Sequence, residues 1–199
     1  YMETGMAYQT LGNYSEAGVS YEKALQIWKS KGDLLWQAIL LNNVAILHQA
    51  YGEYEKAAVA FEDGLICAQR SGSTRMQALI STGLGDLYTE LEDFGVAQSN
   101  YRHAEEIARR IDERFLIFYL SIAQAGLALL QKDPTEAHRL INEERELIRS
   151  NASLYEKGLL KMALGRLSLL QGNPSAAVQE LEEAIGCFSE DGRKLEGDT

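Results

Sequence analysis

The feature that most constrains this chain is an alanine that recurs every 40 residues without a change of register. The column consists of Ala17, Ala57, Ala97, Ala137 and Ala177. A constant period of this length is typical of proteins in which one small structural unit is repeated along the chain. The period therefore predicts an array of about five similar units.

Two further columns keep the same spacing, one with small side chains and one with large side chains. Twelve residues before each alanine stand Gly5, Ala45, Gly85, Ala125 and Gly165. Four residues after each alanine stand Tyr21, Phe61, Tyr101, Ile141 and Leu181. Small residues opposite large ones allow two helices to approach closely and interlock. Each unit is therefore predicted to contain two closely packed helices.

The sequence also indicates a turn inside each unit. Five residues before each alanine stand Gly12, Gly52, Glu92, Lys132 and Gly172, and glycine suits the left-handed residue that ends a helix. The next residues are Asn13, Glu53, Asp93, Asp133 and Asn173, four of which are good N-caps. In the fourth unit, Pro134 falls at the first helical position and Glu136 lies three residues after Asp133, as a capping arrangement requires. Each unit is thus predicted to be a helical hairpin.

Short polar stops separate the units, and we find no stretch with strand-like alternation. The stops are Lys31-Gly32-Asp33, Ser71-Gly72-Ser73, Ile111-Asp112-Glu113, Ser150 to Ser153 and Glu190-Asp191-Gly192. They predict one all-α repeat domain over residues 1–199, with units at 1–33, 34–73, 74–113, 114–153 and 154–193 and the start of a sixth at 194–199. Because neither end shows a polar capping repeat, we expect a fragment of a longer chain.

The residues at these fixed positions resemble the tetratricopeptide repeat. The resemblance is carried in the first unit by Tyr8, Gly12, Tyr14, Ala17, Tyr21, Ala24 and Leu25. The second unit contributes Ala45, Gly52, Tyr54, Ala57, Phe61 and Leu65, and the third Leu84, Gly85, Tyr88, Phe94, Ala97, Tyr101 and Ala104. The resemblance implies a right-handed α-solenoid of about five helical hairpins. Since the period is 40 and not 34, the helices are expected to be longer than usual.

The last two units depart from the family pattern. The column of Tyr8, His48 and Tyr88 continues as Ala128 and Ser168. The column of Tyr14, Tyr54 and Phe94 continues as Pro134 and Pro174. We therefore expect units four and five to pack differently from the first three.

Composition and charge indicate a soluble cytoplasmic protein. The chain has a net charge of −10 and no apolar run long enough to cross a membrane, so we expect neither membrane insertion nor direct binding of nucleic acid. The densest basic stretch, with Arg102, Arg109, Arg110 and Arg114, is interleaved with glutamates and is interpreted as a solvated helix face. Cys67 and Cys187 lie in one column three units apart, too far for a disulfide, which fits a reducing cytoplasm.

We find no pattern that predicts catalysis, a cofactor site or a metal site. The three histidines, His48, His103 and His138, lie in different units and have no other ligands at metal-binding spacing. The stretch from Gly83 to Tyr88 approaches a dinucleotide-binding fingerprint but lacks the third glycine and a preceding strand. No nucleophile stands beside a base. The chain is therefore predicted not to be an enzyme and to need no cofactor.

The resemblance also implies where a ligand would bind. In tetratricopeptide arrays the first helix of each hairpin lines a concave groove, and its exposed columns usually contact the ligand. These columns correspond to Met6, Gln9, Asn42, Ile46, Gln49, Thr82, Asp86, Thr89, Ile122, Leu129, Met162, Arg166 and Leu169, with Met2 and Gly126 beside them. Asparagine and glutamine suit an extended peptide, because each amide both donates and accepts hydrogen bonds.

Three functions remain open from the sequence. The first is a protein-interaction scaffold that binds a peptide, a partner domain or other domains of its own chain within a larger signalling or transcription-regulatory protein. The second is a sensory domain that binds a small inducer or signalling peptide and controls an attached ATPase or DNA-binding effector. Long repeats of this kind resemble those of bacterial multidomain regulators, and also those of kinesin light chains and polarity adaptors. The third, ranked lowest, is an accessory segment of an enzyme.

Overall fold

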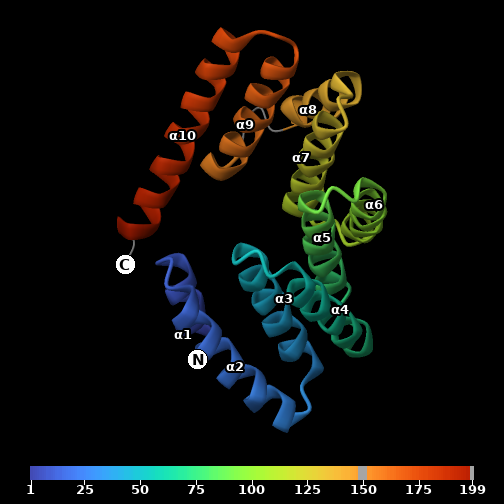
Figure 1. The fold of residues 1–199 in the computed structure, drawn as a ribbon, viewed down its shortest axis with the longest axis vertical. Helices are drawn as coiled ribbons and strands as arrows, with labels where there is room; N and C mark the ends of the chain where they lie inside the picture. Colours follow the sequence, from blue (N-terminus) through green and yellow to red (C-terminus); the bar gives the residue numbers. More distant parts are fainter. Residues whose placement is uncertain (148–151, 198–199) are drawn as a thin grey trace. The chain divides into compact units, whose positions relative to one another are not determined.

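The computed structural model describes residues 1–147 and 152–197, which form ten α-helices arranged as five antiparallel hairpins (Figure 1). The described residues contain no strand, so the predicted all-α class and its helical hairpins are confirmed. The helices are α1 (Met2–Thr10), α2 (Tyr14–Lys31), α3 (Leu34–Ala50), α4 (Tyr54–Ser71), α5 (Thr74–Glu90), α6 (Phe94–Arg110), α7 (Arg114–Leu130), α8 (Pro134–Leu147), α9 (Leu154–Leu170) and α10 (Pro174–Gly197).

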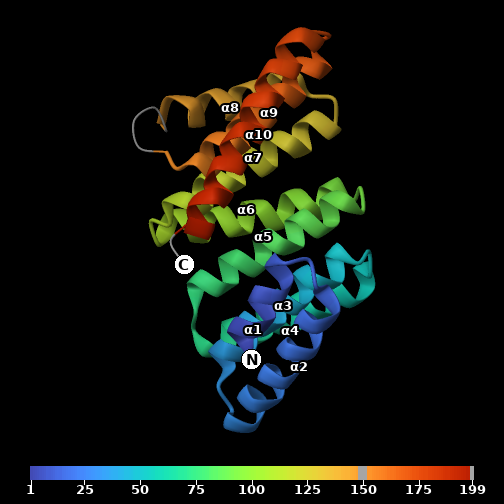
Figure 2. The same ribbon diagram turned by 90° about the vertical axis from the view of Figure 1, so that its left-hand side faces the viewer.

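The chain divides into two compact units, Tyr1–Arg114 and Phe115–Thr199. Unit 1 contains the first three hairpins, in which α2 packs on α3 and α4 packs on α5 (Figure 2). Unit 2 contains the last two hairpins, with their own apolar core. The division falls where the aromatic columns of the sequence end, between the third hairpin and the fourth.

The repeated alanines are the buried contact points of the hairpins. All five have an exposed fraction of 0%. The large side chains fit only because the residues opposite them are small. A Cβ added to Gly5 would lie 2.6 Å from the ring of Tyr21, and one added to Gly165 would lie 2.7 Å from Cγ of Leu181. The predicted pairing of small and large columns is therefore confirmed.

The turns inside the hairpins all use the left-handed residue that the sequence predicts. The φ angles are 74° at Gly12, 71° at Gly52 and 75° at Gly172, and 59° at both Glu92 and Lys132. In each turn the following residue donates its backbone N–H to a carbonyl five residues earlier, as from Asn13 to Tyr8 at 2.8 Å. Such bonds satisfy helix-end carbonyls, which is why the turn keeps its shape even without glycine.

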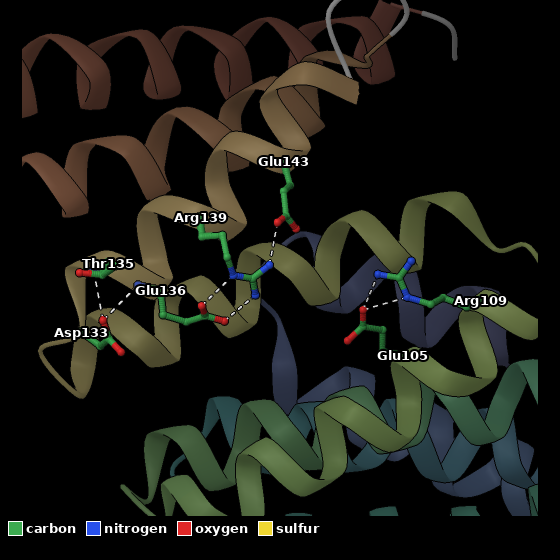
Figure 3. Close-up of polar contacts among 7 residues, drawn as sticks. All are labelled: Glu105, Arg109, Asp133, Thr135, Glu136, Arg139 and Glu143. Atoms are coloured by element: carbon green, nitrogen blue, oxygen red, sulfur yellow. Dashed lines mark hydrogen bonds and ion pairs between the residues drawn. The ribbon is translucent and has the colours of Figure 1, made fainter.

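Of the four residues predicted as good N-caps of the second helices, three form a cap. The Asp133 carboxylate accepts the backbone N–H groups of Thr135 and Glu136 (Figure 3), Asp93 accepts from Val96, and Asn173 accepts from Ala176. Asn13 and Glu53 make no side-chain cap.

Two glutamates near the starts of these second helices are occupied by other partners. Lys56 and His48 hydrogen-bond the Glu53 carboxylate and hold its pKa below the usual range, so it is not directed at the helix end. Glu136 likewise pairs with Arg139 at 2.6 Å, while Arg139 also reaches Glu143 at 2.7 Å (Figure 3). The carboxylate of Glu136 is thereby engaged along the helix surface.

One predicted boundary is wrong. The stop at Glu190-Asp191-Gly192 lies inside α10, which is a single helix of 24 residues ending at Gly197. At the real breaks, Gly32 and Gly72 are followed by Asp33 and Ser73, whose side chains accept a backbone N–H of the next helix. Gly192 is followed by Arg193, which has no acceptor, so nothing starts a new helix there.

The break predicted at Ser150 to Ser153 lies partly outside the described residues. Its described end, Ser153, starts α9 with a capping box: the Ser153 hydroxyl accepts the backbone N–H of Glu156, and the Glu156 carboxylate accepts the backbone N–H of Ser153 at 2.7 Å.

Candidate functional site

Unit 1 has a hollow of about 500 Å³ between α1, α2 and α3. We call it the α1–α3 pocket. Its lining residues are Met6, Gln9, Thr10, Tyr14, Tyr21, Asn43, Ile46 and Ala50. Three of these, Met6, Gln9 and Ile46, belong to the groove columns that the sequence predicts. Volumes of about 300 to 1,000 Å³ are typical of ligand sites, so the hollow is large enough to hold a ligand.

A buried tyrosine orients Gln9 in this pocket. The Tyr21 side chain has an exposed fraction of 0%, and its hydroxyl donates to Oε1 of Gln9 at 2.7 Å. Burial raises the pKa of Tyr21, so the hydroxyl stays protonated and remains a donor at neutral pH. Because the Gln9 oxygen is occupied, the Nε2 group of Gln9 is left to donate hydrogen bonds to a ligand.

The wall formed by α3 adds an amide and an apolar side chain. Asn43, Ile46 and Ala50 are spaced three and four residues apart, which places them on one face of the helix. The amide of Asn43 has no hydrogen-bond partner among the described residues. Ile46 and Met6 are 40% and 50% exposed, so both offer apolar contact area at the surface. The pocket therefore combines apolar contacts with hydrogen-bonding amides.

None of the eight lining residues carries a charge. Burying a charged group without a partner is costly, so the α1–α3 pocket favours an uncharged ligand group. Such a group could be an apolar side chain with the peptide bonds on either side of it.

In the second hairpin the residue that corresponds to Tyr21 is Phe61, which has no hydroxyl. Gln49, which corresponds to Gln9, instead donates from Nε2 to Oε1 of Glu90 at 2.8 Å. This bond connects α3 to α5. The predicted groove residue Gln49 is thus engaged in joining neighbouring hairpins.

The third hairpin uses two predicted groove residues to hold another tyrosine. The Tyr101 hydroxyl donates to Oδ1 of Asp86 at 2.7 Å and lies 3.1 Å from Oγ1 of Thr89. Thr89 also donates to the carbonyl of Gly85 at 2.8 Å. Tyr101 is buried, so Asp86 and Thr89 help to hold a core side chain in place.

Two of the predicted groove residues are buried. Thr82 is 5% exposed and its hydroxyl donates to the carbonyl of Ala78, within its own helix. Ile122 is 8% exposed and lies in the apolar core of unit 2. Neither side chain is accessible to a ligand, so both are packing residues.

The remaining predicted positions are only partly accessible. Asn42 is half-buried on α3. In unit 2, Leu129 and Met162 pack against the core, whereas Arg166 and Leu169 are exposed on α9. The structure therefore gathers three of the predicted residues into one hollow and leaves the others outside it.

Sequence reasoning missed most of the lining. The missed residues are Thr10, Tyr14, Tyr21, Asn43 and Ala50. Tyr14 and Tyr21 belong to the aromatic columns that were assigned to packing, and Tyr14 also contacts the ring of Tyr51 at a centroid distance of 5.8 Å. The adjacent asparagines 42 and 43 could have indicated the site. They lie on neighbouring faces of α3, and the face that carries Asn43, not the one that carries Asn42, lines the pocket.

Within the described residues, no group of three or more His, Cys, Asp or Glu side chains is placed to hold a metal ion. In the same part of the chain, no helix is both long and apolar enough to span a membrane.

The architecture is that of a helical-hairpin repeat protein, and comparison with known proteins identifies its class. Residues 1–65 match the family model "Tetratricopeptide repeat". The matched segment covers the first hairpin and most of the second, and the hairpins that follow have the same helical-hairpin structure. No curated protein matches the chain significantly.

Solved structures with the same fold cover almost the whole chain. BtubC (BKLC) from P. vanneervenii has a TM-score of 0.71 at 19% identity, covering 94% of this chain and 78% of that one. A protein from Podosopora anserina, described as a kinesin light chain with nearly identical TPR-like repeats, has a TM-score of 0.69 at 16% identity, covering 96% and 95%. These similarities confirm the tetratricopeptide-like α-solenoid class.

Proposed function

We propose that this protein is a non-catalytic scaffold that binds an extended peptide segment of a partner through the α1–α3 pocket. The observation that supports this most is the composition of the lining, which joins exposed apolar side chains to the amides of Gln9 and Asn43. A peptide supplies both kinds of partner at once, because its backbone offers N–H and C=O groups beside each side chain.

The geometry suggests how such a segment would be held. One apolar side chain of the peptide enters between Met6 and Ile46. Its flanking carbonyl accepts from Nε2 of Gln9, and the Asn43 amide pairs with a neighbouring peptide group. Tyr14 adds aromatic surface at the rim of the pocket, where it already contacts Tyr51.

Replacing Ile46 with arginine is expected to weaken peptide binding by about tenfold or more, because it places a charge at the centre of an uncharged contact. Peptides selected from a random phage-displayed library against the wild-type protein provide the ligands, and fluorescence anisotropy measures their affinity.

Ile66→Arg is the matched control, since Ile66 is 51% exposed on α4 and does not line the pocket. It should leave binding unchanged, and circular dichroism should show the same helix content in both variants. Equal affinity of the Ile46 and Ile66 variants would refute the pocket as the binding site.

A second candidate function is the recognition of a small uncharged molecule. The volume of about 500 Å³ lies within the range of small-ligand sites. A thermal-shift screen of metabolites separates the two, because a ligand that binds only the folded state raises the melting temperature in proportion to its concentration and affinity. A metabolite that stabilises the wild type but not Ile46→Arg would favour the sensory function.

We place the scaffold in the cytoplasm, within a larger signalling or transcription-regulatory protein, without direct contact to nucleic acid or membrane. The net charge of −10 supports the last point, because polyanions are repelled by an acidic protein. Fluorescence microscopy of a tagged protein tests the location. Identifying the domains encoded beside this segment tests whether it is part of a regulatory protein.

A further inference from the structure

The turns of unit 1 form two edges of opposite charge. The α2–α3 and α4–α5 turns lie on one side of the unit, and the α3–α4 and α5–α6 turns lie on the other (Figure 2). Near the first set of turns the chain places six exposed cations: Lys29, Lys31, Arg70, Arg75, Arg110 and Arg114. We call this set the basic edge. The opposite turns carry mainly glutamate and aspartate, including Glu53, Glu90, Glu92 and Asp93.

The cations of neighbouring hairpins lie within reach of one another. Arg75 at the start of α5 pairs with Glu113, beyond the end of α6, at 2.9 Å. Burial and the charge of Asp63 raise the pKa of Cys67, and the charges of Arg70 and Lys29 act in the opposite direction, which places both cations near the same thiol. The basic edge is therefore continuous across the three hairpins.

Most of these cations have no carboxylate partner. Among the described residues, Lys29, Arg70, Arg110 and Arg114 make no ion pair within 4.0 Å. Arg109, by contrast, is held by Glu105 at 2.6 Å (Figure 3). The chain has 29 acidic and 19 basic residues, so carboxylates are plentiful. At the turns themselves stand three carboxylates: Asp33, which caps α3, Glu113, which pairs with Arg75, and Asp112. The basic edge therefore carries more cations than carboxylates.

Helix stability explains only part of this arrangement. Lys29, Lys31 and Arg70 lie in the last turns of their helices, where a cation interacts favourably with the helix dipole. Arg75 and Arg114 lie in the first turns of α5 and α7, where the same dipole disfavours a cation. The ion pair with Glu113 accounts for Arg75, but no such partner within the described part of the chain accounts for Arg114.

Both tryptophans of the chain lie at the same edge. Trp28 on α2 and Trp36 on α3 stack with ring centroids 5.3 Å apart and planes 13° apart. Lys31 lies over the Trp28 ring at 4.5 Å. Both rings are only half-buried. Tryptophan and arginine are among the residues that contribute most to binding energy in protein interfaces.

We propose that the basic edge is a second binding surface, which takes an acidic, extended segment of a partner protein. Arginine guanidinium groups bind carboxylates through paired hydrogen bonds, and the tryptophan pair offers an apolar contact beside them. This surface is distinct from the α1–α3 pocket, whose lining is uncharged. A short acidic peptide fits it better than a long nucleic acid, because the rest of this acidic protein repels an extended polyanion.

The test uses a fluorescein-labelled oligoglutamate peptide of roughly ten residues, which spans roughly 33 Å when extended. We expect saturable binding by anisotropy that weakens as salt rises from about 0.1 M to about 1 M, where the Debye length falls from about 10 Å to about 3 Å. Unlabelled peptide should also change the tryptophan fluorescence, because both tryptophans lie at the basic edge.

The double variant Arg70→Glu with Arg110→Glu reverses two charges and should lower the affinity for the oligoglutamate peptide by about tenfold or more. Arg102→Glu is the matched control, since Arg102 is exposed in the middle of α6, and it should have little effect. An oligoglutamine peptide should not bind.

Equal binding of oligoglutamine, an equal loss in the Arg102 variant, or tighter binding of a single-stranded oligonucleotide of the same charge would each overturn the proposal. Salt-sensitive self-association without peptide binding would overturn it as well, and would assign the edge to a second copy. Binding of library peptides at the α1–α3 pocket should persist in the double variant, so the two proposals fail separately.

Discussion

Replacing Phe61 with alanine is expected to lower the free energy of unfolding of unit 1 by about 3 to 5 kcal/mol. Phe61 is 0% exposed and lies in the core that α3, α4 and α5 share. Its ring rests on the backbone of α5, because a Cβ added to Gly83 would lie 2.5 Å from Cε1 of Phe61. Removing the ring leaves a cavity between two hairpins, where the backbone of neither can move in to fill it.

Urea unfolding followed by tryptophan fluorescence measures this loss directly, since Trp28 and Trp36 both lie in unit 1. Circular dichroism at the same urea concentrations reports both units together. Val59→Ala, on the same helix and 58% exposed, is the matched control and should change stability by less than about 0.5 kcal/mol. A similar loss in the two variants would mean that Phe61 is not a core residue.

The sequence predicts the fold down to the conformation of single turns, because the residues that determine each turn are close together and recur in every hairpin. Glu92 and Lys132 show how repetition adds information. Neither residue prefers a positive φ, yet both adopt it at 59°, since they stand in a column where glycine does so in other hairpins. One copy of the turn would not have predicted this conformation.

Signals without such support were less reliable. Gly192 looks like another helix stop, but α10 continues through it because no N-cap residue follows. Asn13 is a good N-cap residue by type, yet its side chain makes no cap, and nothing in the structure explains the difference. A residue type favours a local structure, and its neighbours decide whether that structure forms.

The site could be predicted only in part, because a column of a repeat does not fix the exposure of each member. Thr82 and Ile122 share a column with Asn42 and Met162, and the column runs along the border between groove and core. Small rotations of a helix move a residue across this border. Asn42 and Met162 are half-buried there, while Thr82 and Ile122 are buried.

Substituting leucine for Ala97 is expected to lower the free energy of unfolding of unit 1 by about 1 to 3 kcal/mol. Ala97 has an exposed fraction of 0%, and α6, on which it lies, packs against α5. A leucine adds three carbon atoms at this contact and must either adopt a strained rotamer or push the helices apart. Urea unfolding followed by tryptophan fluorescence and circular dichroism measures the loss.

Ser99→Leu, on the same helix and exposed, separates overpacking from the effect of leucine itself. Leucine is a better helix former than serine, so this control should be neutral or slightly stabilising. A neutral result for Ala97→Leu would mean that the alanine column does not mark close contacts between helices. Because the same alanine recurs in every hairpin at an exposed fraction of 0%, Ala57→Leu should lower the stability of unit 1 by a similar amount. Agreement between these two positions would show that the 40-residue period records one packing constraint repeated along the chain.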